Sequence, residues 1–137
     1  MADVVGVDPA RLRPVELFDA ISDEDLALVA HQMEDRVVEA GEHLAREGAS
    51  GYFFFVIFDG TCEVTKGGQA VATLGPGQFF GETAVLETTR RTATVTATSP
   101  MNVGAMFGAD FAKLASDSPE LHARIKQVIA ERRGPAS

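Results

Sequence analysis

A series of short segments rich in β-branched and aromatic residues follows residue 36, and turns that mostly contain glycine separate them. Short strands alternating with turn residues at this spacing are typical of an antiparallel sandwich or barrel. The region from 36 to 106 therefore predicts a mainly β fold. The expected strands are 36–40, 43–46, 52–59, 61–66, 69–74, 92–98 and 102–106.

Two of these segments also predict burial and turn geometry. Residues 52–58 are apolar at successive rather than alternate positions, so we expect both faces of that strand to be buried. A run of aromatic residues like this one is more typical of a core than of a ligand site. The sequence Lys66-Gly67-Gly68-Gln69 predicts a two-residue hairpin, because glycine adopts the positive φ angles that such a turn requires.

Helical patterns precede the strands. Apolar spacing over 10–18 is compatible with a short helix that Pro14 interrupts. Ser22 is expected to cap a second helix, since Asp25 follows it at the capping-box position. Apolar residues on one face of this second helix predict that it covers one end of a sheet. They are Leu26, Val29 and Met33.

Helical patterns also follow the strands. A short helix is predicted over 109–115, and Ser118-Pro119 is a favourable start for a final helix that Gly134-Pro135 ends. This last helix has an apolar stripe made of Leu121, Ile125, Val128 and Ile129. We therefore expect three parts: a helical segment over 1–34, the strands over 35–107 and C-terminal helices over 108–137.

Composition excludes several classes of function. A net charge of −8 and a pI of about 4.8 disfavour nucleic acids and anionic membranes as partners. Cys62 is the single cysteine, so we expect no disulfide and no cysteine metal site. The histidines have no ligand spacing, and no nucleophile lies beside a general base, so neither a metal nor an enzyme is expected. No apolar run is long enough to span a membrane and no signal peptide is evident, which predicts a cytoplasmic protein.

The stretch 79–95, F-F-G-E-T-A-V-L-E-T-T-R-R-T-A-T-V, has the features of an anion-binding loop. Backbone N–H groups at the start of a short helical turn have no partner within the turn and can hold an anion. The pair Arg90-Arg91 adds planar donors that suit phosphate oxygens. The carboxylate of Glu82 instead needs donors, which sugar hydroxyls supply. The loop therefore predicts a ligand that carries both a phosphate and a ribose.

The same stretch resembles the phosphate-binding cassette of cyclic nucleotide-binding domains, with F-G-E-x-A-V-L, five residues, and then R-T-A-T-V. The upstream segment is similar to that family as well. It contains Glu47-Gly48, Gly51 and the pattern Phe54-x-Val56-Ile57-x-x-Gly60-x-x-x-Val64. The resemblance covers roughly 37–106. It implies a double-stranded β-helix, or jelly-roll, barrel with N-terminal helices and a C-terminal lid or dimerisation helix.

The resemblance also implies roles for individual residues. Arg91 would pair with the cyclic phosphate, and Glu82 would accept a hydrogen bond from the ribose 2′-hydroxyl. Gly81 would allow close backbone approach. Thr83 departs from the family, in which a larger apolar residue is frequent at this position, and would place a hydroxyl near the ligand. The remaining positions are the backbone N–H groups of Ala84 and Thr92 at the phosphate, and an apolar wall beside the base made of Val71 and Leu74.

Several alternatives stay open at this stage. We favour cAMP over cGMP as the ligand, although Thr92 does not decide between them. Glu82 and Arg91 could instead pair with each other in a silent module that only contacts other proteins. The final helix either closes over the base and joins a second subunit or packs only on its own barrel. The chain could also be the regulatory part of a larger effector, such as a transcription regulator, kinase, channel or acyltransferase.

Overall fold

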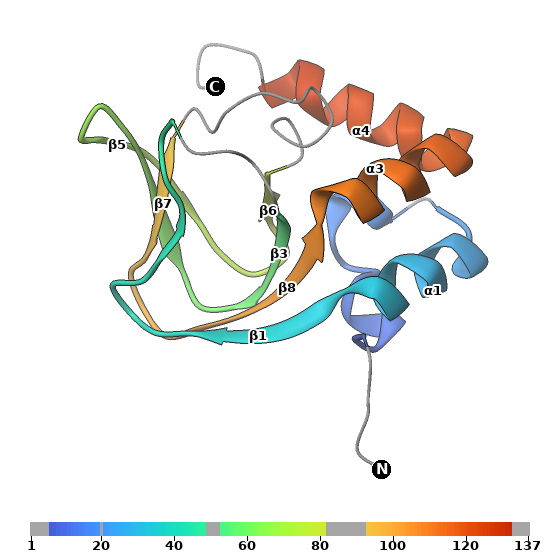
Figure 1. Ribbon diagram of the computed structural model, residues 1–137, viewed down its shortest axis with the longest axis horizontal. Helices are drawn as coiled ribbons and strands as arrows, with labels where there is room; N and C mark the ends of the chain where they lie inside the picture. Colours follow the sequence, from blue (N-terminus) through green and yellow to red (C-terminus); the bar gives the residue numbers. More distant parts are fainter. Residues whose placement is uncertain (1–5, 20, 49–52, 82–92, 133–137) are drawn as a thin grey trace.

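The computed structural model of the chain describes residues 6–19, 21–48, 53–81 and 93–132, the last range without the side chains of residues 128, 129 and 132. Within these residues eight strands form two four-stranded antiparallel sheets, with helices at one end of them (Figure 1). One sheet has the order β1-β8-β3-β6 and the other β2-β7-β4-β5. The predicted mainly β, jelly-roll architecture with flanking helices is confirmed.

The strands lie close to their predicted positions. They are β1 (Glu34–Val38), β2 (His43–Ala45), β3 (Phe53–Asp59), β4 (Cys62–Lys66), β5 (Gln69–Leu74), β6 (Phe79–Phe80), β7 (Thr94–Ala97) and β8 (Met101–Phe107). The two-residue strand β6 was not predicted. It forms because Phe79 and Phe80 pair with Val56 and Phe55 of β3, a contact between distant residues that local sequence does not reveal.

The hairpin between β4 and β5 is confirmed. Lys66 pairs with Gln69, and the two glycines between them have φ angles of 57° and 82°. Positive φ at both central positions is the geometry of a type I′ turn, whose twist matches that of the flanking strands.

The helical elements are two 3₁₀ turns and three α-helices. They are η1 (Pro9–Arg11), η2 (Glu16–Phe18), α1 (Asp23–Gln32), α3 (Gly108–Asp117) and α4 (Pro119–Arg132). The expected short helix over 10–18 is thus two separate 3₁₀ turns. Pro14 lies between them, and proline cannot donate the backbone hydrogen bond that a continuous helix needs.

Serine caps fix the starts of two helices, as predicted. The Ser22 hydroxyl accepts from the N–H of Asp25 at 3.1 Å, at the start of α1. The Ser118 hydroxyl accepts from the N–H of Leu121 at 3.2 Å and donates to the carboxylate of Asp25 at 2.7 Å. Ser118 therefore joins the start of α4 to the first turn of α1.

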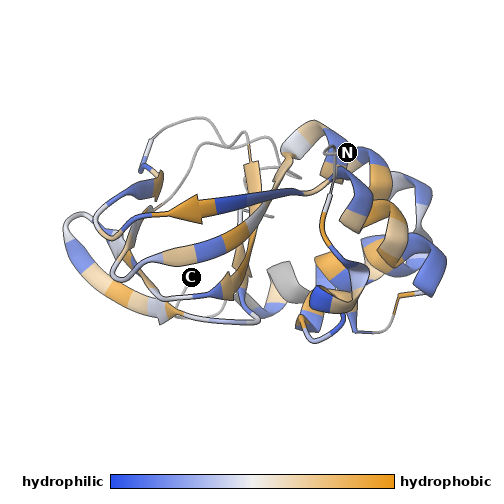
Figure 2. Cartoon of the chain, turned by 90° about the horizontal axis from the view of Figure 1, so that it is seen from below, coloured by the Kyte–Doolittle hydropathy of each residue, from blue (hydrophilic) through white to orange (hydrophobic). Residues whose placement is uncertain are grey.

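Two hydrophobic cores lie on opposite sides of the first sheet, and β3 contributes to both. Phe54 and Val56 face the helices, whereas Phe55 and Ile57 face the barrel interior. This confirms that the apolar run is buried on both faces. Figure 2 shows hydrophobic and hydrophilic residues interspersed along the helices, as expected where a helix has one face in a core.

Ring contacts tie the helices to the sheet. Phe54 stacks on Phe111 of α3, with ring centroids 4.1 Å apart and planes 5° apart. Phe18 of η2 meets the Phe54 ring edge-on at 6.3 Å. Elements from both ends of the chain therefore pack on one residue of β3, which places the helices on the outer face of the first sheet.

Candidate functional site

The structure describes three of the predicted site residues, namely Gly81, Val71 and Leu74. The other five lie outside the described residues, so their predicted roles stay predictions. They are Glu82, Thr83, Ala84, Arg91 and Thr92.

The described flanks of the predicted loop are held by both sheets. Before the loop, Phe80 of β6 stacks on Phe55 with ring centroids 5.0 Å apart. Gly81 then follows with a φ of 100°, a backbone conformation that strains any residue with a side chain. After the loop, β7 pairs with β2 and β4 in the second sheet. Residues 82–92 therefore connect one sheet to the other from anchored ends.

The two predicted wall residues on β5 have different surroundings. Leu74 is half-buried, lies opposite Cys62 and packs against the barrel core. Val71 is 44% exposed and lies at a register irregularity, where Val64 pairs with Ala72 and the next residue pairs with Ala70. A bulge of this kind changes the direction of a side chain relative to regular alternation. The structure thus places Leu74, but not Val71, against the barrel interior.

Sequence reasoning did not single out Val64 as an inward-facing residue. Val64 of β4 packs against the same barrel core as Leu74. The signal was the alternation of Cys62 and Val64 along β4, which places both on the inner face. Burial raises the pKa of the Cys62 thiol to about 11, so this core side chain is neutral at physiological pH and not a nucleophile.

Glu47 fixes the position of the β4–β5 hairpin. Its carboxylate accepts from the N–H of Gly67 at the hairpin tip at 3.0 Å. Its own N–H donates to the Thr94 hydroxyl of β7 at 3.0 Å. One residue just after β2 thus holds both the hairpin and the strand that follows the predicted loop.

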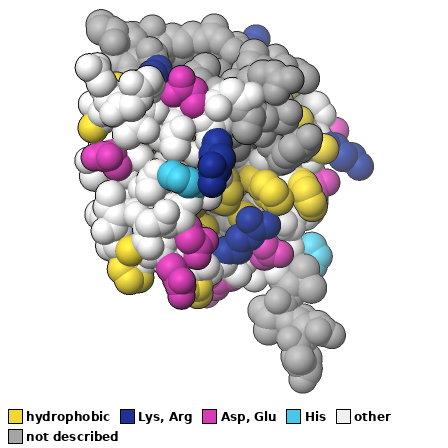
Figure 3. All heavy atoms as spheres, turned by 60° about the vertical axis from the view of Figure 1, so that its left-hand side comes forward, with side chains coloured by type: hydrophobic (Ala, Val, Ile, Leu, Met, Phe, Trp, Pro, Cys, Tyr) yellow, Lys and Arg dark blue, Asp and Glu magenta, His cyan; other side chains and the backbone are white. Residues whose placement is uncertain are grey.

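Charged side chains are spread over the surface. Figure 3 shows one face on which acidic and basic side chains are interspersed, with hydrophobic side chains gathered beside basic ones. Among the described residues, no three His, Cys, Asp or Glu side chains are grouped so that they could hold a metal ion. None of the helices in that part of the chain is long and apolar enough to cross a membrane.

Comparison with known proteins identifies the family. Residues 35–118, which include both sheets and the predicted loop, match the cyclic nucleotide-binding domain. The chain belongs to this family. The match begins at Asp35 in β1 and ends at Ser118, the cap of α4, so it leaves out η1, η2, α1 and α4.

Two relatives are much longer than this chain. A cyclic nucleotide-gated potassium channel of Rhizobium etli is 34% identical over 120 residues, which are 88% of this chain and 34% of the channel. A cGMP-dependent protein kinase of Caenorhabditis elegans is 30% identical over an alignment of 137 positions, which covers 90% of this chain and 18% of the kinase. The chain therefore corresponds to a minor part of each.

A solved structure supports the same assignment. The regulatory domain of Toxoplasma gondii PKA, crystallised with cAMP, superposes with a TM-score of 0.72 at 31% identity. The alignment covers 77% of this chain and 42% of the Toxoplasma chain. The cyclic nucleotide-binding domains thus share both sequence and fold with this protein.

Proposed function

We propose that the chain binds a cyclic nucleotide through residues 81–92 and serves as a regulatory domain within a signalling protein. The observation that carries this proposal is the presence of both Glu82 and Arg91 at the family's spacing, in a chain whose match to the family covers 35–118. The anchored flanks of the loop support it, since β6 and β7 belong to different sheets.

The proposed contacts follow the chemistry of the ligand. The Arg91 guanidinium holds two oxygens of the cyclic phosphate, while the Glu82 carboxylate accepts from the ribose 2′-hydroxyl. Backbone N–H groups of Ala84 and Thr92 complete the phosphate cradle, and Gly81 permits close approach. Thr83 adds a hydroxyl near the ligand. Leu74, with Val64 beside it, forms the apolar wall next to the base.

We propose cAMP rather than cGMP as the preferred ligand. The Toxoplasma domain was crystallised with cAMP, whereas the nematode relative is named a cGMP-dependent kinase, so the relatives include both specificities. Thr92 alone does not separate the two bases. The ratio of the affinities for cAMP and cGMP, measured by titration, tests this preference.

We further propose that the end of α4 closes over the bound base. The start of α4 is fixed, because Leu121 and Ile125 are buried in the helix-side core and Arg124 binds η2. Any closing movement therefore falls on the residues after Ile125. Ligand can drive it only by binding the closed form more tightly than the open one. Hydrogen exchange along α4 tests this: nucleotide should slow exchange after residue 125, and unchanged rates there would contradict closure.

A second subunit and an effector are the proposed partners. The described side chains of the apolar stripe, Leu121 and Ile125, are already buried within this chain. A homodimer through α4 would therefore use later positions of that helix. The channel and kinase relatives support an effector in the same polypeptide or complex.

The decisive experiment is calorimetric titration with cAMP and cGMP. We expect micromolar or tighter binding to the native chain, and a roughly tenfold to hundredfold loss in Arg91→Ala, because one charge-assisted bidentate contact is removed. Arg90→Ala is the matched control and should bind within about threefold of the native chain. No heat with either nucleotide, on folded protein shown to be free of ligand, would instead establish a silent module.

A further inference from the structure

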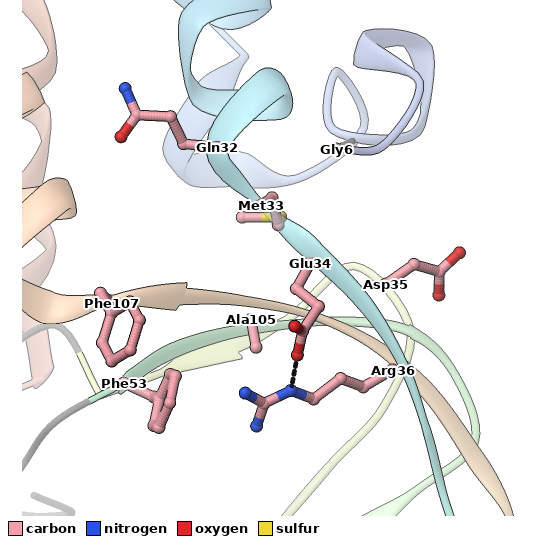
Figure 4. Close-up of a pocket in the computed structure, with 9 residues that line it drawn as sticks. All are labelled: Gly6, Gln32, Met33, Glu34, Asp35, Arg36, Phe53, Ala105 and Phe107. Carbon is pink, nitrogen blue, oxygen red and sulfur yellow. Dashed lines mark hydrogen bonds and ion pairs between the residues drawn. The ribbon is translucent and has the colours of Figure 1, made fainter. Parts of the chain in front are cut away.

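A cavity of about 440 Å³ lies where β1 and β8 meet the end of α1 (Figure 4), and its described lining includes none of Val71, Leu74 and Gly81. Its volume is within the range of about 300–1,000 Å³ that is typical of small-molecule sites. Met33 and Ala105 supply buried apolar surface, and Gln32 and Glu34 supply polar surface. An apolar floor with a few polar groups at the rim suits an amphipathic ligand.

Aromatic rings form one wall of this cavity. Phe53 and Phe107 stack with centroids 4.9 Å apart and planes 22° apart. Phe107 is nevertheless 59% exposed, at the position where β8 ends and α3 begins. The other large hydrophobic side chains exposed in the described part of the chain are aliphatic. Phe107 therefore offers an aromatic surface against which a second ring can stack.

Arg36 supplies a cation beside these rings. Its guanidinium carbon lies 4.5 Å from the centroid of Phe53, and its Nε donates to the Glu34 carboxylate. Figure 4 shows this bond and the guanidinium beside the Phe53 ring. The two terminal nitrogens have no hydrogen-bond partner among the described residues. A carboxylate accepts from such a pair of donors with both oxygens.

The surrounding charges favour an anion with a single charge. Glu34 already shares the guanidinium, and Asp35 also lines the cavity. Hydrogen bonds from Asn102 and Arg11 lower the pKa of Asp35, so it is ionised at neutral pH. A phosphate dianion would be repelled by these carboxylates and by a chain of net charge −8 more strongly than a carboxylate would.

We propose that this cavity binds a small aromatic carboxylate, whose ring packs against Phe107 and Phe53 and whose carboxylate accepts hydrogen bonds from the terminal nitrogens of Arg36. The proposal uses none of the described nucleotide-site residues and does not depend on nucleotide binding. An aromatic carboxylate can bind whether or not the chain binds a cyclic nucleotide.

Three probes separate the contribution of the aromatic ring from that of the carboxylate. Phenylacetate carries ring and charge, acetate lacks the ring, and 2-phenylethanol lacks the charge. We expect phenylacetate to bind with a Kd on the order of 1 mM or tighter, as is typical of a fragment of this size. In two-dimensional NMR spectra of the full chain it should shift the methyl signals of Met33 and Ala105. The other two probes should bind at least about tenfold more weakly.

Variants locate the site. Arg36→Gln and Phe107→Ala should each weaken phenylacetate binding by about tenfold or more. The first removes the donors to the carboxylate, and the second removes the aromatic surface for the ring. Lys113→Gln and Leu28→Ala are the matched controls, because they change an exposed charge and an exposed apolar side chain elsewhere. The dispersion of the spectra shows that each variant is folded.

Several results would overturn the proposal. Absence of phenylacetate binding would do so, as would equal binding of acetate, which would indicate a surface charge effect only. Binding that survives both Arg36→Gln and Phe107→Ala would place the probe elsewhere. Displacement by cAMP, together with loss of binding in Arg91→Ala, would assign the probe to the nucleotide loop.

Discussion

Arg124 is the residue that ties the last helix to the start of the chain. Its guanidinium donates to the backbone oxygen of Glu16 at 3.2 and 3.3 Å and to the Glu16 carboxylate at 3.2 Å. The Asp19 carboxylate lies 3.9 Å away, and the Arg124 side chain is only 19% exposed. These are charge-assisted contacts in a partly desolvated place, where they are worth more than at an open surface.

We predict that Arg124→Ala lowers the free energy of unfolding by about 1–3 kcal/mol, because hydrogen bonds to a charged group are lost together. Urea denaturation followed by far-UV circular dichroism measures the change. Lys126→Ala, at an exposed position of the same helix, is the control and should change stability by less than about 0.5 kcal/mol. Equal effects of the two substitutions would show that the Arg124 contacts do not stabilise the fold.

At the scale of elements, the turn between β3 and β4 packs tightly against the turn between β7 and β8. Gly60 has a φ of 86°, and a Cβ placed there would lie 2.3 Å from the Pro100 oxygen and 2.8 Å from the Met101 Cα. Gly77 has the same φ of 86° but no atom within 4 Å of such a Cβ. The two glycines therefore share a backbone conformation and differ in their surroundings.

Gly77→Ala should accordingly lower the free energy of unfolding by about 1–2 kcal/mol, because alanine is strained in the left-handed backbone conformation. Gly60→Ala should cost at least about 1–3 kcal/mol more, since backbone atoms must also move. Thermal and urea denaturation of both variants measure the difference. Similar losses for both would mean that the two turns separate readily, which would contradict the close packing.

Most elements that local sequence determines were predicted correctly, although the helix expected over 10–18 is two 3₁₀ turns. Features that depend on distant residues were not predicted. The burial of both faces of β3 followed from its run of apolar residues, and the hairpin followed from Gly67-Gly68. By contrast, β6 exists only because it pairs with β3, and the bulge at Val71 depends on how β5 aligns with β4.

The candidate sites also differ in how far they depend on local sequence or on distant residues. The loop was predicted from its motif, and the described Gly81 has the left-handed backbone that a glycine there permits. The cavity beside Arg36 had no sequence signal, because it is formed by residues from β1, β3 and β8 that lie far apart in the chain. Patterns within one segment cannot reveal a site whose walls come from several strands.

At the scale of the whole molecule, the two cores share the sheet β1-β8-β3-β6, so the helices and the barrel depend on each other. Phe54 and Val56 support the helices, while Phe55 and Ile57 on the same strand support the barrel. Loss of packing on one face should therefore loosen the strand for both. The three sequence segments predicted as 1–34, 35–107 and 108–137 should then unfold as one cooperative unit.

Phe54→Ala tests this cooperativity. Phe54 is fully buried and stacks on Phe111, so its truncation should lower stability by about 3–5 kcal/mol. Amide NMR signals of α1 and of β4, which lies in the other sheet, should disappear at the same reduced urea concentration. Leu28→Ala, at a position 48% exposed on α1, should leave both midpoints almost unchanged. If α1 unfolds in Phe54→Ala while β4 stays folded, the helices form a separate unit, because the shared sheet then transmits no loss of stability to the barrel.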